Sequence, residues 1–499
     1  MDKKIINSVL LSKIKKLNKH RKIVLCHGVF DLLHIGHIRH FKEAKKHGDI
    51  LVVSITTDKY VNKGPNRPYF NVDDRAMMIS SIEEVDYVFI NNNQDAINVL
   101  KILKPNFYIK GKDYKKKSKD LTKKIYEEET AVKRVGGKII FTSSQMNSAS
   151  TLLNKFFIKT SENQKKYIDK IKTKYEFEYI NKILLKIKNI KALVIGETII
   201  DRYIETKALG LGSKSPIVAA QILNQNDYLG GSAAILNHLL ALNSNSEILM
   251  PANKSDNKYL KKLKNKNIFL TSKWKVPVKT RFLENFKNRK IFEVQKITNK
   301  IWDTDNESKF IKKIGQIIKR FDLILIADFG HGLFSSKIID FIEKQKKFKS
   351  ANVQTNSYNY GFNLITKYKN LNYFCIDKVE MSLATQDNTN DINVLNKKLL
   401  NKMKKKTDFC ITRGKDGASM VKQNKLQNSC PVMFADPVDT VGAGDAFFTL
   451  SSVLKQMKVE DDLNLFLSNC YAGLKTRVIG NSRPVTLLEL QRAIDYLLK

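Results

Sequence analysis

Cysteine is scarce in this chain of 499 residues: there are five, spread along the sequence, and no two of them form a CxxC pair. Most stand in apolar runs, which indicates reduced, buried thiols in a cytoplasmic protein rather than a disulfide framework. Long apolar runs are also missing, because none reaches the roughly 18 residues that a membrane-spanning helix needs. The apolar stretch near the start is too short for a secretory signal, so we expect no membrane insertion.

Acidic residues are few beside basic ones, with 49 Asp and Glu against 88 Lys and Arg, a formal net charge of +39. A charge of this size raises the question of a nucleic-acid partner. The lysines are spread over the whole chain, however. The densest runs, at 115–117 and 404–406, are short, and no nucleic-acid-binding motif accompanies them. We therefore expect solvated, lysine-rich faces and no specific nucleic acid as partner.

No internal repeat is visible, and a chain of this length should hold more than one domain. Residues 20–155 alternate short apolar runs with helical patterns, which predicts a parallel α/β sheet. Its expected strands are 23–26, 50–55, 87–90, 107–110 and 138–141. Residues 156–188 are charged, follow a helical pattern and lack glycine and proline. We expect an α/β protein with a first domain at 1–155, a helical linker at 156–188 and a second domain at 189–499.

Residues 23–37, IVLCHGVFDLLHIGH, form a strand, a turn at Gly28 and the start of a helix near Gly36. Backbone N–H groups and the positive end of a helix dipole favour an anion at such a turn. His34 and His37 add hydrogen-bond donors, which suits a nucleoside triphosphate. The alternatives are a metal cluster that includes His40, or histidines that are merely polar helix residues. No cysteine or carboxylate stands at convincing ligand spacing, which disfavours the metal.

The whole string resembles the HxGH nucleotidyltransferase superfamily, in particular its cytidylyltransferase-like branch. The matching residues are Gly28, Phe30, Asp31, His34, Gly36 and His37. The resemblance implies a Rossmann-like fold and transfer of a nucleotidyl group from CTP or ATP with release of pyrophosphate. It implies that His34 and His37 act in catalysis with Lys45 and Mg²⁺. Further nucleotide-binding residues implied by it are Arg75, Gly111, Asp113, Ser150 and Thr151.

Residues 436–447 read DPVDTVGAGDAF. Gly442, Ala443 and Gly444 lack bulk, so their backbone N–H groups can face an anion at the start of a helix. Asp445 stands where an ordinary N-capping carboxylate would also stand, and that reading is the alternative. The string resembles the DTxGAGD signature of the ribokinase/PfkB sugar-kinase family. The resemblance implies that Asp445 takes the proton from the substrate hydroxyl while the GAG amides hold the transferring phosphoryl group.

Other parts of the second half resemble the same kinases and imply a ribokinase-like fold. The residues implied to bind the sugar are Asp201, Gly230, Gly231 and His331. The common pattern has asparagine where this chain has Ala234, so Asn237 or His238 would have to replace it. Asp377 and Glu380 stand at the family's NxxE element and suit Mg²⁺ held through water. Thr412 and Gly414 are implied to lie near ATP, as Glu380 does.

The two halves together resemble the bifunctional heptose kinase/nucleotidyltransferases, with the domain order reversed. We expect an enzyme that phosphorylates a sugar or sugar phosphate with ATP and then joins a sugar 1-phosphate to a nucleotide, for surface polysaccharide or lipopolysaccharide precursors. The expected partners are these small molecules, and a homodimer stays open. The alternatives are a non-catalytic nucleotide- or sugar-sensing protein, and two unconnected kinase and nucleotidyltransferase reactions.

Overall fold

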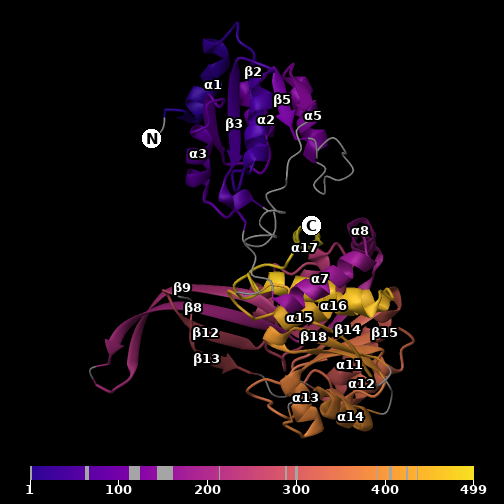
Figure 1. Ribbon diagram of the computed structural model, residues 1–499. Coiled ribbons are helices and arrows are strands. Elements are labelled where there is room, and N and C mark those ends of the chain that lie inside the picture. Colours follow the sequence, from indigo (N-terminus) through magenta and orange to yellow (C-terminus); the bar gives the residue numbers. More distant parts are fainter. Residues whose placement is uncertain are drawn as a thin grey trace. The chain divides into compact units, whose positions relative to one another are not determined.

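The computed structural model describes residues 3–61, 67–111, 124–142, 161–212, 214–286, 289–297, 302–389, 391–403, 407–422, 425–434 and 437–498. The chain forms two compact units (Figure 1). One unit comprises Met1–Thr160 together with Gln491–Lys499, and the other comprises Ser161–Leu490. No helix among the described residues is long and apolar enough to cross a bilayer.

The first unit contains a parallel sheet in the order β1-β4-β3-β2-β5-β6. Its strands are β1 (Ile5–Ile6), β2 (Ile23–Gly28), β3 (Ile50–Thr56), β4 (Tyr87–Asn91), β5 (Phe107–Lys110) and β6 (Lys138–Phe141). Its helices are α1 (Ser8–Leu17), α2 (Ile35–Lys45), α3 (Val72–Ser80), α4 (Ile97–Leu103) and α5 (Lys124–Arg134). The five predicted strands are confirmed, whereas the two-residue edge strand β1 was not predicted because so short a run carries no periodic signal.

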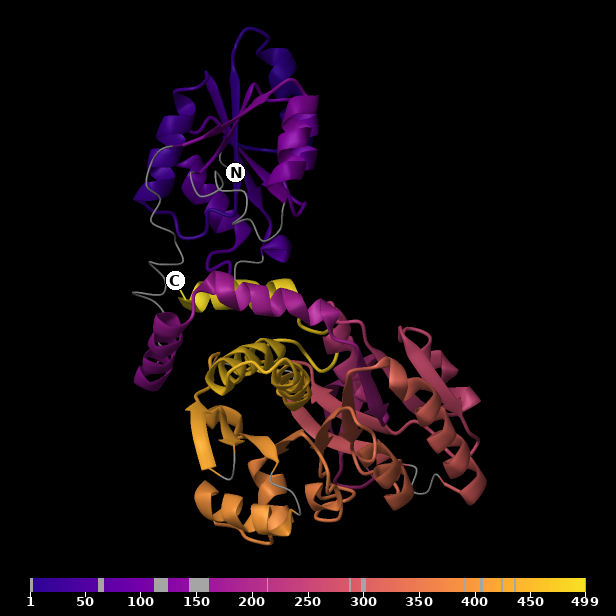
Figure 2. The same cartoon turned by 90° about the vertical axis from the view of Figure 1, so that its right-hand side faces the viewer.

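Helices cover both faces of this sheet (Figure 2). Ile23 and Leu25 of β2 pack into a core with α1, α4 and α5, whereas Val24 and Cys26 pack into a second core with α2 and α3. Both faces of the strand are therefore apolar, as expected for a parallel sheet between helix layers. The strand order reverses between β2 and β5, and ligands bind outside the carboxyl ends of strands at such a switch point.

The second unit is built around a nine-stranded sheet in the order β11-β10-β7-β14-β15-β16-β17-β18-β19. The strands are β7 (Ala192–Gly196), β10 (Glu247–Ala252), β11 (Lys266–Leu270), β14 (Leu323–Asp328), β15 (Phe348–Val353), β16 (Tyr373–Asp377), β17 (Asp408–Thr412), β18 (Ala418–Lys422) and β19 (Lys425–Cys430). The main helices are α9 (Ser232–Ala241), α10 (Asn257–Leu260), α11 (Thr304–Ile317), α12 (Ser336–Glu343), α13 (Lys378–Thr385), α14 (Ile392–Lys402), α15 (Ala443–Gln456) and α16 (Asp461–Lys475). The last helix, α17 (Leu487–Leu498), begins in this unit, and its residues from Gln491 onward belong to the first unit. The first seven strands in this order, from β11 at the edge to β17, are parallel. Strands β18 and β19 are antiparallel and form the other edge.

A smaller sheet in the order β13-β12-β8-β9 extends from this unit (Figure 1). It consists of β8 (Thr198–Leu211), β9 (Val218–Gly231), β12 (Val278–Glu284) and β13 (Lys290–Lys296). The first half of β8 follows β7 of the main sheet directly in the chain and is buried, and Asp201 lies in that half. The smaller sheet can therefore place its side chains over the carboxyl ends of the main strands.

The segment expected as a linker at 156–188 is different in the structure. Its described part forms two helices, α7 (Glu162–Lys174) and α8 (Phe177–Lys186), and both belong to the second unit. Tyr167 Oη donates to the backbone oxygen of Asp462, and Tyr175 Oη donates to Asp462 Oδ1 at 2.7 Å. The charged pattern of these helices masked a buried stripe that includes Ile171, and this stripe holds them on the unit.

Candidate functional sites

The loop between β2 and α2 brings the histidine motif to the carboxyl edge of the first sheet. Phe30 and Leu32 adopt left-handed φ values of 50° and 51°, which turns the chain sharply toward the helix. His34 is the N-cap of α2, and its Nδ1 accepts the backbone N–H of Gly36 at 3.0 Å. The rings of His34 and His37 stack with centroids 4.0 Å apart, and the Phe30 ring meets His37 edge-on at 5.5 Å. Both imidazoles therefore lie together at a helix N-terminus.

Asp31 and Arg75 stabilise this loop through buried hydrogen bonds and ion pairs. Asp31 is 2% exposed, and its carboxylate accepts the backbone N–H of Tyr69 at 2.9 Å and forms an ion pair with Arg67 Nε at 2.8 Å. Arg75 is fully buried, and its Nη1 donates to the backbone oxygen of Val29 at 2.6 Å. Its other donors bond Phe70 O, Thr56 O and Asp58 Oδ1. These two residues were expected to bind nucleotide, but their polar atoms are engaged in shaping the loop.

Lys45, which was predicted to act in catalysis, lies at the opposite end of α2 from the histidine motif. Lys45 is the last residue of α2, and His34 caps its first turn. The rise of an α-helix separates the two by about 15 Å. Lys45 Nζ instead donates to the backbone oxygen of Asp49 at 2.8 Å and pairs with Asp86 Oδ2 at 2.5 Å. It stabilises the opposite end of the helix.

Gly111 follows β5 directly and is buried. Cys26 of β2 pairs with Ile109 of β5, so Gly28 and Gly111 lie at corresponding positions on the two sides of the switch point. This places the end of β5 beside the histidine loop. Asp113, Ser150 and Thr151 lie outside the described residues.

The alternative of a histidine metal cluster has no support in the part of the chain that the structure describes, where no three His, Cys, Asp or Glu residues are grouped to hold a metal. His40 Nδ1 lies 3.1 Å from Thr142 Oγ1, within the protein. Burial lowers the pKa of His40 to about 4. This imidazole is therefore a neutral core residue.

In the second unit, Asp445 lies in the first turn of α15, behind the Gly442–Gly444 loop. Gly442 is the N-cap, with φ 79°, and no side chain caps the helix, so the capping alternative for Asp445 is wrong. Asp445 is 6% exposed, and Gln354 Nε2 donates to its Oδ1 at 2.9 Å. Burial, and then the charge of Asp201, raise the pKa of Asp445 to about 7. A carboxyl with such a pKa can accept a proton near neutral pH.

The glycines of this loop have different surroundings. A Cβ on Gly442 would lie 2.5 Å from Asn481 Oδ1. A Cβ on Gly444, by contrast, would meet no atom within 4 Å apart from its chain neighbours and the backbone of its own helix. Gly442 is therefore needed for the close turn, whereas the space beside Gly444 is open to a phosphate at the N-terminus of α15.

Asp201 on β8 faces the same loop and has two partners that sequence reasoning missed. Arg281 Nη1 pairs with Asp201 Oδ1 at 2.5 Å, and Asn481 Nδ2 donates to Asp201 Oδ2 at 2.9 Å. A Cβ on Gly230 would lie 2.1 Å from Asp201 Oδ2, so this glycine makes room for the carboxylate. Lys279 and Arg281 share one face of β12, because side chains two residues apart on a strand point to the same side. This two-residue period is the sequence signal that could have found Arg281.

His331 follows β14 in the turn 328–332. Glu197 fixes this turn by accepting the backbone N–H groups of Phe329, His331 and Leu333 at 2.9–3.1 Å. The His331 side chain is buried, and neither ring nitrogen has a hydrogen-bond partner among the residues that the structure describes. Burial, and then the charge of Lys279, lower its pKa to about 4. A neutral imidazole with free polar atoms fits the expected role toward a sugar hydroxyl.

Asp377 and Glu380 form a reciprocal capping box at the start of α13. Asp377 Oδ1 accepts the N–H of Glu380 at 2.7 Å, and Glu380 Oε2 accepts the N–H of Asp377 at 2.9 Å. Burial, and then the charge of Asp377, raise the pKa of Glu380 to about 8. Thr412 pairs with Asp377 across the sheet, and Gly414 follows with a left-handed φ of 55°. These four residues therefore meet at the carboxyl ends of β16 and β17.

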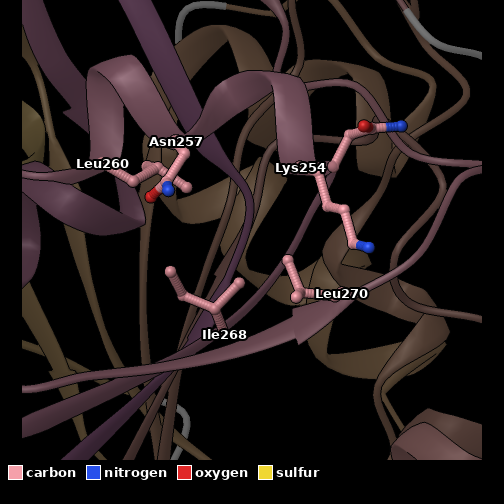
Figure 3. Close-up of a pocket in the computed structure, with 6 residues that line it drawn as sticks. Lys254, Asn257, Leu260, Ile268 and Leu270 are labelled. Atoms are coloured by element: carbon pink, nitrogen blue, oxygen red, sulfur yellow. The ribbon is translucent and has the colours of Figure 1, made fainter.

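Packing bears on the expectation that another residue replaces the asparagine missing at Ala234. Ala234 is buried in α9, and His238 Nδ1 lies 2.9 Å from Tyr471 Oη within the core. Burial lowers the pKa of His238 to about 3, so its imidazole is a neutral core residue. A pocket of about 350 Å³ lies elsewhere, lined by Asn253, Lys254, Asn257, Leu260, Ile268 and Leu270 (Figure 3). It holds none of the motif residues.

Both halves match known families. Residues 25–163 match the family described as cytidylyltransferase-like, and residues 189–463 match the pfkB family carbohydrate kinases. The solved structure of phosphofructokinase-2 from Escherichia coli in complex with potassium is 13% identical, covers 62% of this chain and 99% of its own, and has a TM-score of 0.50. This likeness confirms the expected ribokinase-like fold.

Curated relatives match the first half. Bifunctional protein HldE of Aliarcobacter butzleri (strain RM4018) is 40% identical over 132 residues, which are 26% of this chain and 27% of the relative. Bifunctional protein HldE of Campylobacter fetus subsp. fetus (strain 82-40) is 41% identical over 115 residues, or 23% and 25%. The match thus spans about a quarter of the length of these relatives.

Proposed function

We propose that this chain, which belongs to the pfkB family of carbohydrate kinases and carries a cytidylyltransferase-like domain, activates a sugar in two steps. The kinase half phosphorylates a sugar or sugar phosphate with ATP. The other half joins a sugar 1-phosphate to a nucleotide from CTP or ATP and releases pyrophosphate. The use of the product in surface polysaccharide or lipopolysaccharide precursors is part of the same proposal.

The observation that carries the proposal is the placement of Asp445. Its carboxylate lies behind an open glycine loop at the start of α15, with Asp201 nearby and a pKa of about 7. In the proposed step, Asp445 accepts the proton of the sugar hydroxyl as that oxygen attacks the γ-phosphorus and ADP leaves. The amides of the loop and the dipole of α15 stabilise charge on the transferring phosphoryl group. Asp201 and His331 orient the acceptor.

Asp377 and Glu380 fit the Mg²⁺ that this chemistry uses. Their pKa values are both raised, first by burial, and for Glu380 next by the neighbouring carboxylate. A cation held through water would relieve this burial of negative charge. When bound, Mg²⁺ supplies neutralisation of phosphate charge.

The transferase half needs no protein nucleophile. A phosphate oxygen of the sugar 1-phosphate attacks the α-phosphorus of the nucleoside triphosphate, and pyrophosphate departs. The stacked His34 and His37, at the N-terminus of α2, are placed to neutralise charge on the phosphates. Asp31 and Arg75 keep the loop in this shape.

The test uses the full chain and two variants, His34→Ala and Asp445→Asn. Free sugars and sugar phosphates are screened with Mg²⁺, ATP and CTP, and products are identified by mass. The wild type, and a mixture of the two variants, should form a nucleotide sugar from the unphosphorylated substrate, whereas each variant alone should not. If the transferase uses only a sugar phosphate that the kinase does not make, the two reactions are unconnected. If no substrate yields ADP or pyrophosphate, the non-catalytic reading holds.

A further inference from the structure

We propose that the ammonium group of Lys475 is a built-in monovalent cation of the phosphoryl-transfer site, so that the kinase needs no dissolved one. This inference rests on the proposed kinase function. It concerns a residue outside every motif described above, at the last position of α16.

Lys475 joins the glycine loop to the segment after α16. It is fully buried, and its Nζ donates to the backbone oxygen of Val441 at 3.0 Å and to that of Gly480 at 2.6 Å. Val441 directly precedes Gly442. A Cβ on Gly442 would lie 3.4 Å from Lys475 Nζ, which places the ammonium beneath the phosphate loop.

Asp439 binds the backbone N–H groups of the same two residues, Val441 and Gly480. Its Oδ1 accepts the N–H of Val441 at 3.1 Å, and its Oδ2 accepts the N–H of Gly480 at 2.8 Å. Asp439 and Lys475 therefore both connect the glycine loop to the segment after α16. The Asp439 carboxylate binds the N–H groups of Val441 and Gly480, and the Lys475 ammonium binds their carbonyl oxygens. Lys290 Nζ, at 2.7 Å, and Tyr203 Oη, at 2.8 Å, complete the partners of Asp439.

The partners of Lys475 are those of a dehydrated monovalent cation. Among the described residues it makes no direct ion pair, and its hydrogen-bond acceptors, Val441 O and Gly480 O, are both carbonyl oxygens. The nearby charges of Asp439, Asp445 and Asp201 favour the cation, although burial outweighs them and lowers the pKa of Lys475 to about 8. A single positive charge here fixes the loop and favours an anion at the N-terminus of α15. Lys475 is therefore a positioning residue, because it acts through the loop.

The test compares two truncations of this side chain. Lys475→Ala removes the ammonium and leaves space for an ion, whereas Lys475→Met removes the charge and fills the space. Each protein is studied as the full chain in KCl, NH₄Cl or NaCl at equal ionic strength. Melting is followed by tryptophan fluorescence, which reports on the second unit alone because Trp274 and Trp302 are the only two tryptophans. ADP formation with the best acceptor is measured alongside.

We expect the wild type to melt and turn over equally in the three salts. Lys475→Ala should lose about 10²-fold in turnover, the effect of one preorganised charge-stabilising group. K⁺ or NH₄⁺, but not Na⁺, should restore much of that loss and raise the melting temperature, and Lys475→Met should not respond. Lys349→Ala is the matched control, because Lys349 is also buried and its Nζ donates to two backbone carbonyls, those of Glu343 and Gln345. Lys349 lies near the amino end of β15, whereas the proposed site lies at the carboxyl ends of the strands. The Lys349→Ala control should show no preference among the salts.

Two results would overturn the inference. One is a wild type that itself requires K⁺ or NH₄⁺, and the other is a folded Lys475→Ala protein that no cation stabilises or restores. The melting experiment decides the matter even if no sugar substrate is found, so failure of the proposed kinase function remains distinguishable.

Discussion

Asp445→Asn should make the kinase half inactive and more stable at the same time. The substitution keeps the size of the side chain and its contact with Gln354 but removes the ionisable group. The pKa of Asp445 is about 7 in the folded protein, against an ordinary value of 3.8. Each pKa unit corresponds to about 1.4 kcal/mol, so holding this carboxylate charged costs the folded protein up to about 4 kcal/mol. Relaxation around the charge reduces the expected gain for the asparagine variant to about 1–3 kcal/mol.

The pH dependence of this gain has a definite sign. Because the folded pKa is raised, the contribution of Asp445 to stability is fully present below about pH 4 and is lost as the pH rises to about 7. The asparagine variant has no such loss. Its free energy of unfolding relative to that of the wild type should therefore rise between about pH 4 and pH 7 and then stay constant. Urea unfolding at several pH values, followed by tryptophan fluorescence, measures it. Turnover should fall by about 10²–10⁴ because the base is gone.

Asp303→Asn is the control for this experiment. Asp303 caps α11 in the same unit, accepts the N–H of Asn306 at 2.8 Å and has a lowered pKa. Its replacement should therefore slightly lower stability near neutral pH, the opposite sign. If Asp445→Asn is less stable than the wild type at pH 8, burial does not destabilise the charged form of Asp445. If the variant forms ADP at the wild-type rate, Asp445 is not the base.

Three further predictions concern single side chains. His34→Ala and His37→Ala should each lower pyrophosphate release by about 10²–10³ while ADP formation is kept; an undiminished rate in the double variant would contradict the assignment. Lys45→Ala should leave nucleotidyl transfer unchanged in the same assay, because its ammonium binds at the far end of α2; a loss comparable with that of the histidine variants would show that the helix is placed differently. Arg281→Ala should raise the KM for the acceptor and leave that for ATP, since it positions Asp201; an effect on the KM for ATP alone would refute this role.

The sequence by itself determined the architecture and the position of the two motifs that carry the proposed sites. Continuous apolar runs such as that of β2 specify strands buried on both faces, and the two glycine-containing motifs specify turns at helix starts. These signals are local, since a strand, its turn and the following helix are written within about 20 residues of each other. For the same reason His34, His37 and Asp445 could be identified before any contact was known.

Only the tertiary structure decided which polar atoms remain available at those sites. Lys45 resembles a phosphate ligand in the sequence, but the length of α2 directs it to Asp86. Arg281 and Lys475 carry no motif, and they reach Asp201 and Val441 only because residues 80 and 34 positions apart are folded together. The raised pKa of Asp445 likewise comes from burial and a distant carboxylate. Burial and long-range pairing depend on the packed fold, and no stretch of the sequence alone contains them.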